Sequence, residues 1–538
     1  MIEIDDVLEK CGDFHRYQII LLAFFCFINL LSSMHYYSQT IISFVPEHFC
    51  YDPQFENFTI YDTKEYYNVH GSSACTLRTY EGLSENITFQ PCTNWIYNLD
   101  YGYQSMTSEL NWVCQWAWKS TLGQSMFFIG SVLGTLVFGI YADKIGRLPI
   151  LILSNLTAFV GNTATIFATS VPAFAICRFV SGLATDSNFV MMYILVMEYI
   201  RPSMRTIGLS ICIGVFYCLG SAITPWIAVY CGTWKLFLLV TALPLLTVPL
   251  FYFVLPESAQ WLITQKKYEK AVECLRAVAR VNGKTVDEQV YEEFKAKCIQ
   301  SMEAQSKAEN MMGLFRTPRL RRNTLILFFK SMVITLCYDA ISRNVEGLGI
   351  TPFTMFSLSA TAIFPACIVL ILLQDKIGRK AMASASLLVS GIFTSATGII
   401  LVYRSADAGP VLVASLAIIG RFGVTVAYNS AAQFATELIP TSVRGQGVAA
   451  VHVAGYAFTF FSSYILFLST IFKPLPSLIL GMLSLMGAGL CLFLPETLNR
   501  TLPCTLADGE QFGRGEPVLF FSCFEKGKTT STTSLKDT

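Results

Sequence analysis

The sequence Asp143-Lys144-Ile145-Gly146-Arg147 recurs letter for letter as Asp375-Lys376-Ile377-Gly378-Arg379, 232 residues further along the chain. Three other pairs recur in the same order at spacings of 239 to 243 residues: Glu198 with Arg205 and Glu437 with Arg444, Arg178-Phe179 and Arg421-Phe422, and Leu255-Pro256-Glu257 and Leu494-Pro495-Glu496. Colinear matches at nearly one spacing indicate an internal duplication. The sequence therefore predicts two related halves in the same orientation.

The composition places these halves in a membrane. Of the 538 residues, 53% are apolar and 14% charged, and the mean hydropathy is +0.50, which excludes a string of soluble domains. A spanning helix needs about 20 mostly apolar residues, and twelve such stretches are present. We expect an all-α membrane protein with twelve transmembrane helices in two parallel six-helix halves. The predicted spans are 19–34, 122–141, 148–170, 173–196, 207–230, 236–255, 324–341, 353–373, 383–402, 411–432, 448–471 and 478–494.

The Lys and Arg content of the connections predicts the orientation. Residues 37–120 carry three basic residues, whereas residues 256–323 carry thirteen and are assigned to the cytosol. The predicted order is a cytosolic N-terminus (1–18), a first half (19–255) containing an extracellular loop (37–120), a cytosolic loop with short helices (256–323), a second half (324–495) and a cytosolic tail (496–538).

The predicted outer loop has features of an oxidising compartment. It contains four cysteines, which allow three pairings that the sequence leaves open: Cys50, Cys75, Cys92 and Cys114. Asn57-Phe58-Thr59 and Asn86-Ile87-Thr88 are glycosylation sequons. We therefore predict disulfides and glycosylation at Asn57 and Asn86.

The repeated motif follows a helix with small residues. Gly130, Gly134 and Gly139 are spaced to let this second helix approach a neighbour closely, and we expect that neighbour to be the eleventh helix. Asp143 and Arg147 then flank a tight turn, where a carboxylate can meet the start of the next helix and a guanidinium a neighbouring carboxylate. Such pairs can hold a gate shut.

Longer motifs carry a resemblance to a known family. Asn111-Trp112-Val113-Cys114, Pro256 to Leu262, Phe315-Arg316-Thr317-Pro318 and Glu437 to Arg444 resemble the organic ion transporters of solute carrier family 22, in the major facilitator superfamily, over the chain up to about residue 503. The resemblance implies a plasma-membrane secondary carrier that works by alternating access. It also implies a cytosolic network that closes the inner gate when the site faces outward. The predicted network is Asp143, Arg147, Arg178, Glu198, Arg205, Asp375, Arg379, Arg421, Glu437 and Arg444.

Charged residues inside the predicted spans indicate the charge of the substrate. Burying a charge in a membrane costs free energy, so such residues usually have a function. Asp186, Asp339 and Lys330 give two acids and one base, which favours a cation. By resemblance, Asp186 replaces a lysine of many relatives, and Asn429 replaces a glutamine that faces the cavity in many cation carriers. Tyr456 occupies the position where cation carriers have aspartate and anion or carnitine carriers have arginine, so this position does not distinguish between cation and anion carriers. We expect organic cations or zwitterions such as amines and carnitine-like compounds, with an organic anion carrier as the alternative.

Aromatic side chains complete the predicted binding site, since a cation binds on their faces. The predicted substrate contacts are Asp186, Tyr338, Asp339, Asn429, Tyr456, Tyr36, Phe128, Tyr217 and Tyr428. Packing is the alternative role for each aromatic residue. The identity of a coupling ion, Na⁺ or H⁺, and the oligomeric state stay open.

The sequence lacks the motifs of other functional classes, such as metalloenzymes, ATP-driven pumps and nucleic-acid-binding proteins. The five histidines include no pair at metal-ligand spacing, and there is no Gly-x-x-x-x-Gly-Lys phosphate loop. A net charge of +1 gives no overall basic field for nucleic acid. We therefore expect no cofactor, no metal, no nucleic acid partner and no enzymatic activity, with a non-transporting polytopic receptor or enzyme as the distant alternative.

Overall fold

The protein is described by a computed structural model that covers residues 4–12, 15–51, 75–80, 87–200, 211–304, 311–346, 348, 350–403, 409–498, 500, 502–503, 505–517 and 520–521. Twelve helical segments within these residues are long and apolar enough to cross a membrane, which confirms the predicted number. The first six are α2 (Arg16–Ile42), α5 (Trp118–Ile145), α6 (Arg147–Ile166), α7 (Val171–Leu183) with α8 (Ser187–Tyr199), η4 (Ile213–Tyr217) with α10 (Cys218–Cys231), and α11 (Trp234–Ala242) with η5 (Leu243–Phe253).

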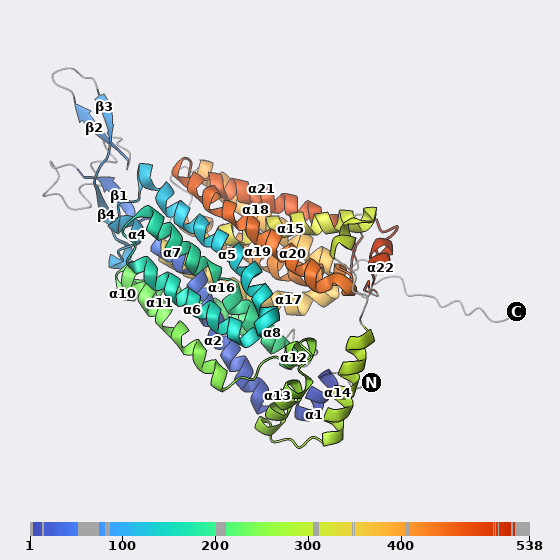
Figure 1. Cartoon of the computed structure of the whole chain (residues 1–538). Helices are drawn as coiled ribbons and strands as arrows, with labels where there is room; N and C mark the ends of the chain where they lie inside the picture. Colours follow the sequence, from blue (N-terminus) through green and yellow to red (C-terminus); the bar gives the residue numbers. More distant parts are fainter. Residues whose placement is uncertain are drawn as a thin grey trace.

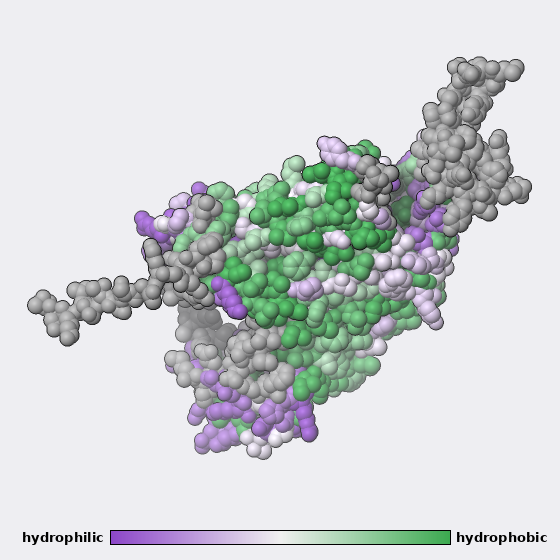
Figure 2. All heavy atoms as spheres, turned by 180° about the vertical axis from the view of Figure 1, so that it is seen from behind, coloured by the Kyte–Doolittle hydropathy of each residue, from purple (hydrophilic) through white to green (hydrophobic). Residues whose placement is uncertain are grey.

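The second six follow after a set of short helices. They are α15 (Pro318–Arg343), α16 (Pro352–Thr361) with α17 (Ile363–Ile377), α18 (Arg379–Tyr403), α19 (Pro410–Leu438), η7 (Thr441–Val443) with α20 (Arg444–Phe467) and η8 (Leu468–Thr470), and α21 (Leu475–Leu492). On the face that Figure 2 shows, an apolar surface lies between two polar ends of the bundle. This is the surface that a bilayer requires.

Several spans are not continuous α-helices. Between α7 and α8 the chain makes a turn at 184–186, and η4 has π-helical geometry. The break between α16 and α17 precedes Pro365, whose ring cannot be accommodated against the carbonyl four residues earlier. Interrupted helices at membrane depth are tolerated where they line a cavity or are buried in protein.

Small antiparallel pairs of strands lie at one end of the bundle, an addition to the all-α prediction. β1 (Glu47–Cys50) pairs with β4 (Trp95–Asn98), and β2 (Thr76–Tyr80) pairs with β3 (Ile87–Pro91). The short elements η2 (Asp100–Gly102), α4 (Met106–Glu109) and η3 (Cys114–Trp116) connect them to α5.

Two disulfides connect this outer segment. Of the three possible pairings, the structure has Cys50–Cys92 and Cys75–Cys114, with Cα atoms 5.6 and 5.5 Å apart. The two predicted glycosylation residues, Asn57 and Asn86, lie outside the described residues.

Short helices lie at the opposite end of the bundle (Figure 1). They are α1 (Ile4–Gly12), α12 (Ala259–Thr264), α13 (Tyr268–Val281), α14 (Glu288–Ala304), η6 (Met311–Phe315) and α22 (Leu506–Gln511). Asn282, after α13, accepts a hydrogen bond from the Tyr17 amide of α2 (2.8 Å), so these helices are held against the first half. We refer to this end as the inner end and to the end with the strands as the outer end.

The glycines of α5 face a different helix from the one predicted. A Cβ atom built on Gly130 would lie 2.2 Å from the Phe179 carbonyl oxygen, and one on Gly134 would lie 1.8 Å from that of Leu183, both on α7 of the fourth span. Gly139 has open space beside it. The glycines themselves therefore do not face the eleventh helix as expected, although α5 does pack against that helix, α20. Spacing along a helix identifies a face and not the helix that covers it.

Candidate functional site

Apolar contacts join the outer ends of the two halves. The Phe44 ring packs edge-on against that of Phe353 on α16, with centroids 5.1 Å apart, and Tyr37 of α2 packs against Phe356 at 5.0 Å. These four rings belong to one buried cluster that draws side chains from both halves. The centre of the bundle is therefore closed toward the outer end.

A buried ion pair lies close to these rings. Asp339 and Arg343 are one turn apart on α15, and Arg343 Nε donates to Asp339 Oδ2 at 3.0 Å. The Tyr36 hydroxyl of α2 and the Ser462 hydroxyl of α20 both donate to the Asp339 carboxylate at 2.6 Å. Asp339, predicted as a substrate contact, is thus neutralised by Arg343 and links α2 to α15.

Phe128 takes part in the same arrangement. The Arg343 guanidinium lies 5.1 Å from the centroid of its ring, and the Tyr36 ring centroid lies 6.5 Å from it. Phe128 and Tyr36 belong to the first half and Arg343 to the second. The predicted substrate contacts Tyr36, Phe128 and Asp339 therefore lie together where the halves meet.

The repeated arginines lie apart from the other predicted gate residues. Arg178 is fully buried and donates to Thr165 Oγ1 (3.0 Å) and Asn162 Oδ1 (3.1 Å) of α6. Arg421 lies over the Tyr338 ring, 4.2 Å from its centroid, and donates to the Tyr37 hydroxyl (3.2 Å). Neither guanidinium pairs with a carboxylate among the described residues. Their described contacts are with polar and aromatic side chains, and their role in the gate network stays a prediction.

Tyrosines surround one carboxylate at the centre of the bundle. Asp186 accepts a hydrogen bond from Thr135 Oγ1 of α5 (3.0 Å) and also interacts with the Tyr456 side chain of α20. The Tyr456 and Tyr428 hydroxyl oxygens are 3.1 Å apart, and Tyr428 stacks on Tyr338 with ring centroids 4.4 Å apart. Asp186, Tyr338, Tyr428 and Tyr456, four of the predicted contacts, are thus brought together.

The local structure explains how Asp186 reaches this place. It lies in the turn between α7 and α8, so the interruption of the fourth span directs a polar residue to the centre. It is about nine-tenths buried and has no basic partner among the described residues.

Two further predicted contacts differ in their surroundings. Tyr217 ends the π-helical turn η4, and its ring centroid is 6.4 Å from that of Tyr37. Single π-helical turns occur frequently at functional sites. Asn429 donates to the Thr425 carbonyl of its own helix (3.0 Å) and makes no described hydrogen bond to the other predicted residues.

The first copy of the repeated motif forms a cap at the inner end. Arg147 Nη1 donates to Asp143 Oδ1 (2.7 Å), and the Arg147 and Leu148 amides at the start of α6 donate to the Glu257 carboxylate at 3.0 and 3.2 Å. Burial raises the pKa of Glu257, whereas these amides oppose that rise. Gly146 is at φ +124°, and a Cβ atom there would lie 2.3 Å from Glu257 Oε2, so only glycine fits.

The second copy repeats this geometry. Arg379 pairs with Asp375 (3.0 Å) and Glu437 (3.1 Å), and its amide donates to Glu496 Oε1 (2.9 Å). Gly378, at φ +103°, likewise leaves no room for a Cβ atom beside Glu496. The duplication seen in the sequence is therefore a duplication of hydrogen bonds.

The acidic residues of the repeated Glu–Arg pair, Glu198 and Glu437, also make equivalent contacts. Glu198 accepts a hydrogen bond from the Ser258 hydroxyl, and Glu437 accepts one from the Thr497 hydroxyl. Arg444 donates to the Ile439 carbonyl (3.3 Å), and its Nη2 has no described partner. Arg205 lies outside the described residues.

All hydrogen bonds and ion pairs between described residues of these motifs stay within one half. The buried clusters at the inner end are likewise separate, one formed by the first half with α1 and α13 and the other by the second half. Among the described residues, contacts join the halves at the outer end and around Asp186 at the centre and not between these inner motifs, which is the arrangement of a site that faces inward.

Sequence reasoning missed two kinds of residue. Arg343 follows Asp339 at the i,i+4 spacing of a helical ion pair, but the predicted span ended at residue 341. Glu257 and Glu496 belong to a sequence repeat to which no role was assigned. The glycines that end the preceding helices, Gly146 and Gly378, were the available signal, because they leave room for these carboxylates.

The chain resembles known proteins over most of its length. Residues 115–463 match the model of the Major Facilitator Superfamily. The chain is 30% identical to "Organic cation transporter 1" of Caenorhabditis elegans over 95% of this chain and 89% of that protein. It is also 30% identical to "Solute carrier family 22 member 3" of Mus musculus over 80% and 76% of the two chains.

A solved structure agrees in fold. The partially occluded inward open conformation of the xylose transporter XylE from E. coli covers 89% of this chain and 99% of its own, with a TM-score of 0.60 at 14% identity. The fold, the inner motifs and the relatives lead to one conclusion: the chain belongs to solute carrier family 22 of the major facilitator superfamily and is a membrane carrier, not an enzyme.

Proposed function

We propose that this carrier moves small organic cations, including zwitterions with a cationic group, across the plasma membrane by alternating access. The observation that carries this proposal is Asp186. It is a buried carboxylate at a helix interruption, without a basic partner among the described residues and next to the Tyr456 and Tyr428 rings. A desolvated carboxylate with aromatic neighbours attracts an organic cation both by charge and through the ring faces.

The names of the relatives support a cation, since one is called an organic cation transporter. The anion alternative has less support. The buried guanidinium groups of Arg421 and Arg178 are both hydrogen-bonded within the protein. Asp339 does not add to the negative charge of the site because Arg343 neutralises it.

For the outward-facing state of the transport cycle, we propose that the duplicated motifs form the closed inner gate. Asp143, Arg147, Glu198 and Arg205 would then meet Asp375, Arg379, Glu437 and Arg444 when the outer contacts open. The partly unsatisfied guanidinium groups of Arg147 and Arg444 support this role, because a buried donor without a partner favours an alternative arrangement that satisfies it.

The orientation is part of the proposal. The excess of Lys and Arg in residues 256–323 supports a cytosolic position of the inner end, with α1 and α22. The disulfides of the outer segment suit the extracellular side.

Uptake of labelled tetraethylammonium into cells expressing the chain tests the proposed function. We expect Asp186→Asn to lower uptake at least about tenfold, because a charge-assisted contact is lost, and Asp186→Glu to retain a part of it. Asp287→Asn, at an exposed position between α13 and α14, is the matched control. Uptake that persists in Asp186→Asn, at equal surface amount, would contradict the role of Asp186.

A further inference from the structure

Lys330 is a buried cation without a partner. It lies on α15 with 1% of its surface exposed. Its Nζ has no hydrogen-bond partner among the described residues, and no described carboxylate pairs with it. Among the described residues, the Phe434 ring lies beside the charge, with its centroid 4.6 Å away. A lysine that only extended to the aqueous interface would expose its amine.

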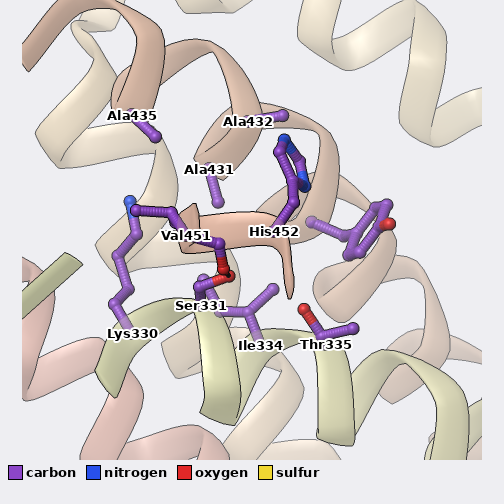
Figure 3. A pocket seen from close by; sticks show the side chains of 10 residues that line it. Lys330, Ser331, Ile334, Thr335, Ala431, Ala432, Ala435, Val451 and His452 are labelled. Carbon is purple, nitrogen blue, oxygen red and sulfur yellow. Dashed lines mark hydrogen bonds between the residues drawn. The ribbon is translucent and has the colours of Figure 1, made fainter. Parts of the chain in front are cut away.

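Lys330 lines a small cavity between α15, α19 and α20 (Figure 3). Ser331 and Thr335 of α15, Tyr428 of α19 and His452 of α20 supply polar groups, and three alanines of α19 leave space. The cavity measures about 20 Å³, somewhat more than one water molecule needs. It has room for one polar group and not for a whole substrate.

The lining also has a consistent electrostatic character. It contains Lys330 and His452 and no acidic residue. Removing a charge from water costs several kcal/mol unless a partner compensates for it. An anionic group in this cavity would be the missing partner of Lys330, and no acidic side chain of the lining would repel it.

The cavity is linked to the site around Asp186 by one residue that belongs to both. Tyr428 lines the cavity, its hydroxyl lies 3.1 Å from that of Tyr456, and Tyr456 interacts with Asp186. Asp186 belongs to the first half and Lys330 to the second. A negative side chain near Tyr456 and a positive side chain near Tyr428 therefore lie beside the same pair of tyrosines.

We propose that Lys330 and its cavity bind the carboxylate of a substrate whose ammonium group lies at Asp186, so that the preferred substrates are small zwitterions. This inference rests on the proposed function and specifies its substrate class. Such a substrate contacts both halves at once, which favours the conformations in which the halves approach each other.

Matched pairs of labelled probes test the inference. β-Alanine, γ-aminobutyrate and 6-aminohexanoate each differ from their own amide only in the carboxylate, and the three lengths allow for the separation of the two charges. We expect at least one acid to enter about tenfold faster than its amide. Lys330→Met is expected to abolish this ratio, since the contact with an ionised group is lost, and Lys330→Arg to restore much of it.

The ratio of acid to amide uptake does not depend on the amount of folded carrier at the surface. Lys284→Met, an exposed lysine after α13, is the control for loss of a positive charge and should leave the ratio unchanged. The inference is overturned if no acid is preferred over its amide, or if the preference survives Lys330→Met.

The two proposals fail in distinguishable ways. Uptake of tetraethylammonium and the amides that depends on Asp186, without a preference for any acid, overturns the role of Lys330 and leaves the cation carrier standing. Absence of uptake of all these probes by the wild-type chain at the cell surface overturns both.

Discussion

At the scale of single residues, the buried pair of Asp339 and Arg343 holds the two halves together at the outer end. Both side chains are nearly inaccessible to water, and each contacts an aromatic residue of the first half, Tyr36 or Phe128. The free energy of such a pair depends on the presence of both partners, because either charge alone is buried without compensation.

We predict that Arg343→Met strongly destabilises the protein, since breaking a buried pair by removing one partner costs about 3–5 kcal/mol. The exchange Asp339→Arg with Arg343→Asp should recover part of the loss. Thermal unfolding of the purified carrier in detergent measures both. Lys235→Met, which breaks the exposed pair with Glu109, is the control and should change Tm little. Equal losses in both single variants would contradict the prediction.

At the scale of elements, the contact between α5 and α7 requires glycine at some positions of α5 and tolerates other residues elsewhere. Gly134 touches the backbone of α7, whereas Gly139, five residues further along the same helix, has no atom of another element within 4 Å of its Cβ position. Replacing glycine with alanine at the two positions therefore distinguishes the effect of close packing from the effect of helix propensity.

We predict that Gly134→Ala separates α5 from α7 and lowers the stability by about 1–3 kcal/mol or more, as overpacking does. Gly139→Ala should be neutral or slightly stabilising, since alanine favours helix. The amount of folded protein at the cell surface and its Tm provide the measurement. Indistinguishable variants would show that α5 can shift to accommodate the added methyl group.

The elements also show what the sequence could predict. The twelve spans follow from runs of apolar residues, and the duplicated caps follow from repeated letters. The end of α2 could not be predicted from apolar residues, because Tyr37 to Ile42 contains polar residues that are buried within the protein. The ion pair of Asp339 was missed for the same reason, since Arg343 lies beyond the last apolar residue of its run. The strands β1 to β4 have no distinctive pattern of their own and are held by disulfides and pairing.

At the scale of the whole molecule, the closed outer end and the separate inner ends predict that a covalent link at the outer end stops the transport cycle. The Phe44 and Phe353 rings lie 5.1 Å apart and belong to different halves. We expect the double variant Phe44→Cys with Phe353→Cys to lose most uptake after oxidation and to regain it after reduction. Each single cysteine variant, treated in the same way, is the control. Uptake that is unaffected by a verified cross-link would mean that these ends do not separate during transport.

The position of Asp339 and Arg343 on one helix has an electrical consequence. Because they are one turn apart on α15, any displacement of that helix carries both charges together, and the membrane potential does no net work on the pair. Lys330 lies on the same helix without a counter-charge. Current associated with reorientation of the empty carrier would therefore arise from the buried charges without a described counter-charge, Lys330, Asp186, Arg178 and Arg421, and a bound zwitterion would add no net charge to it.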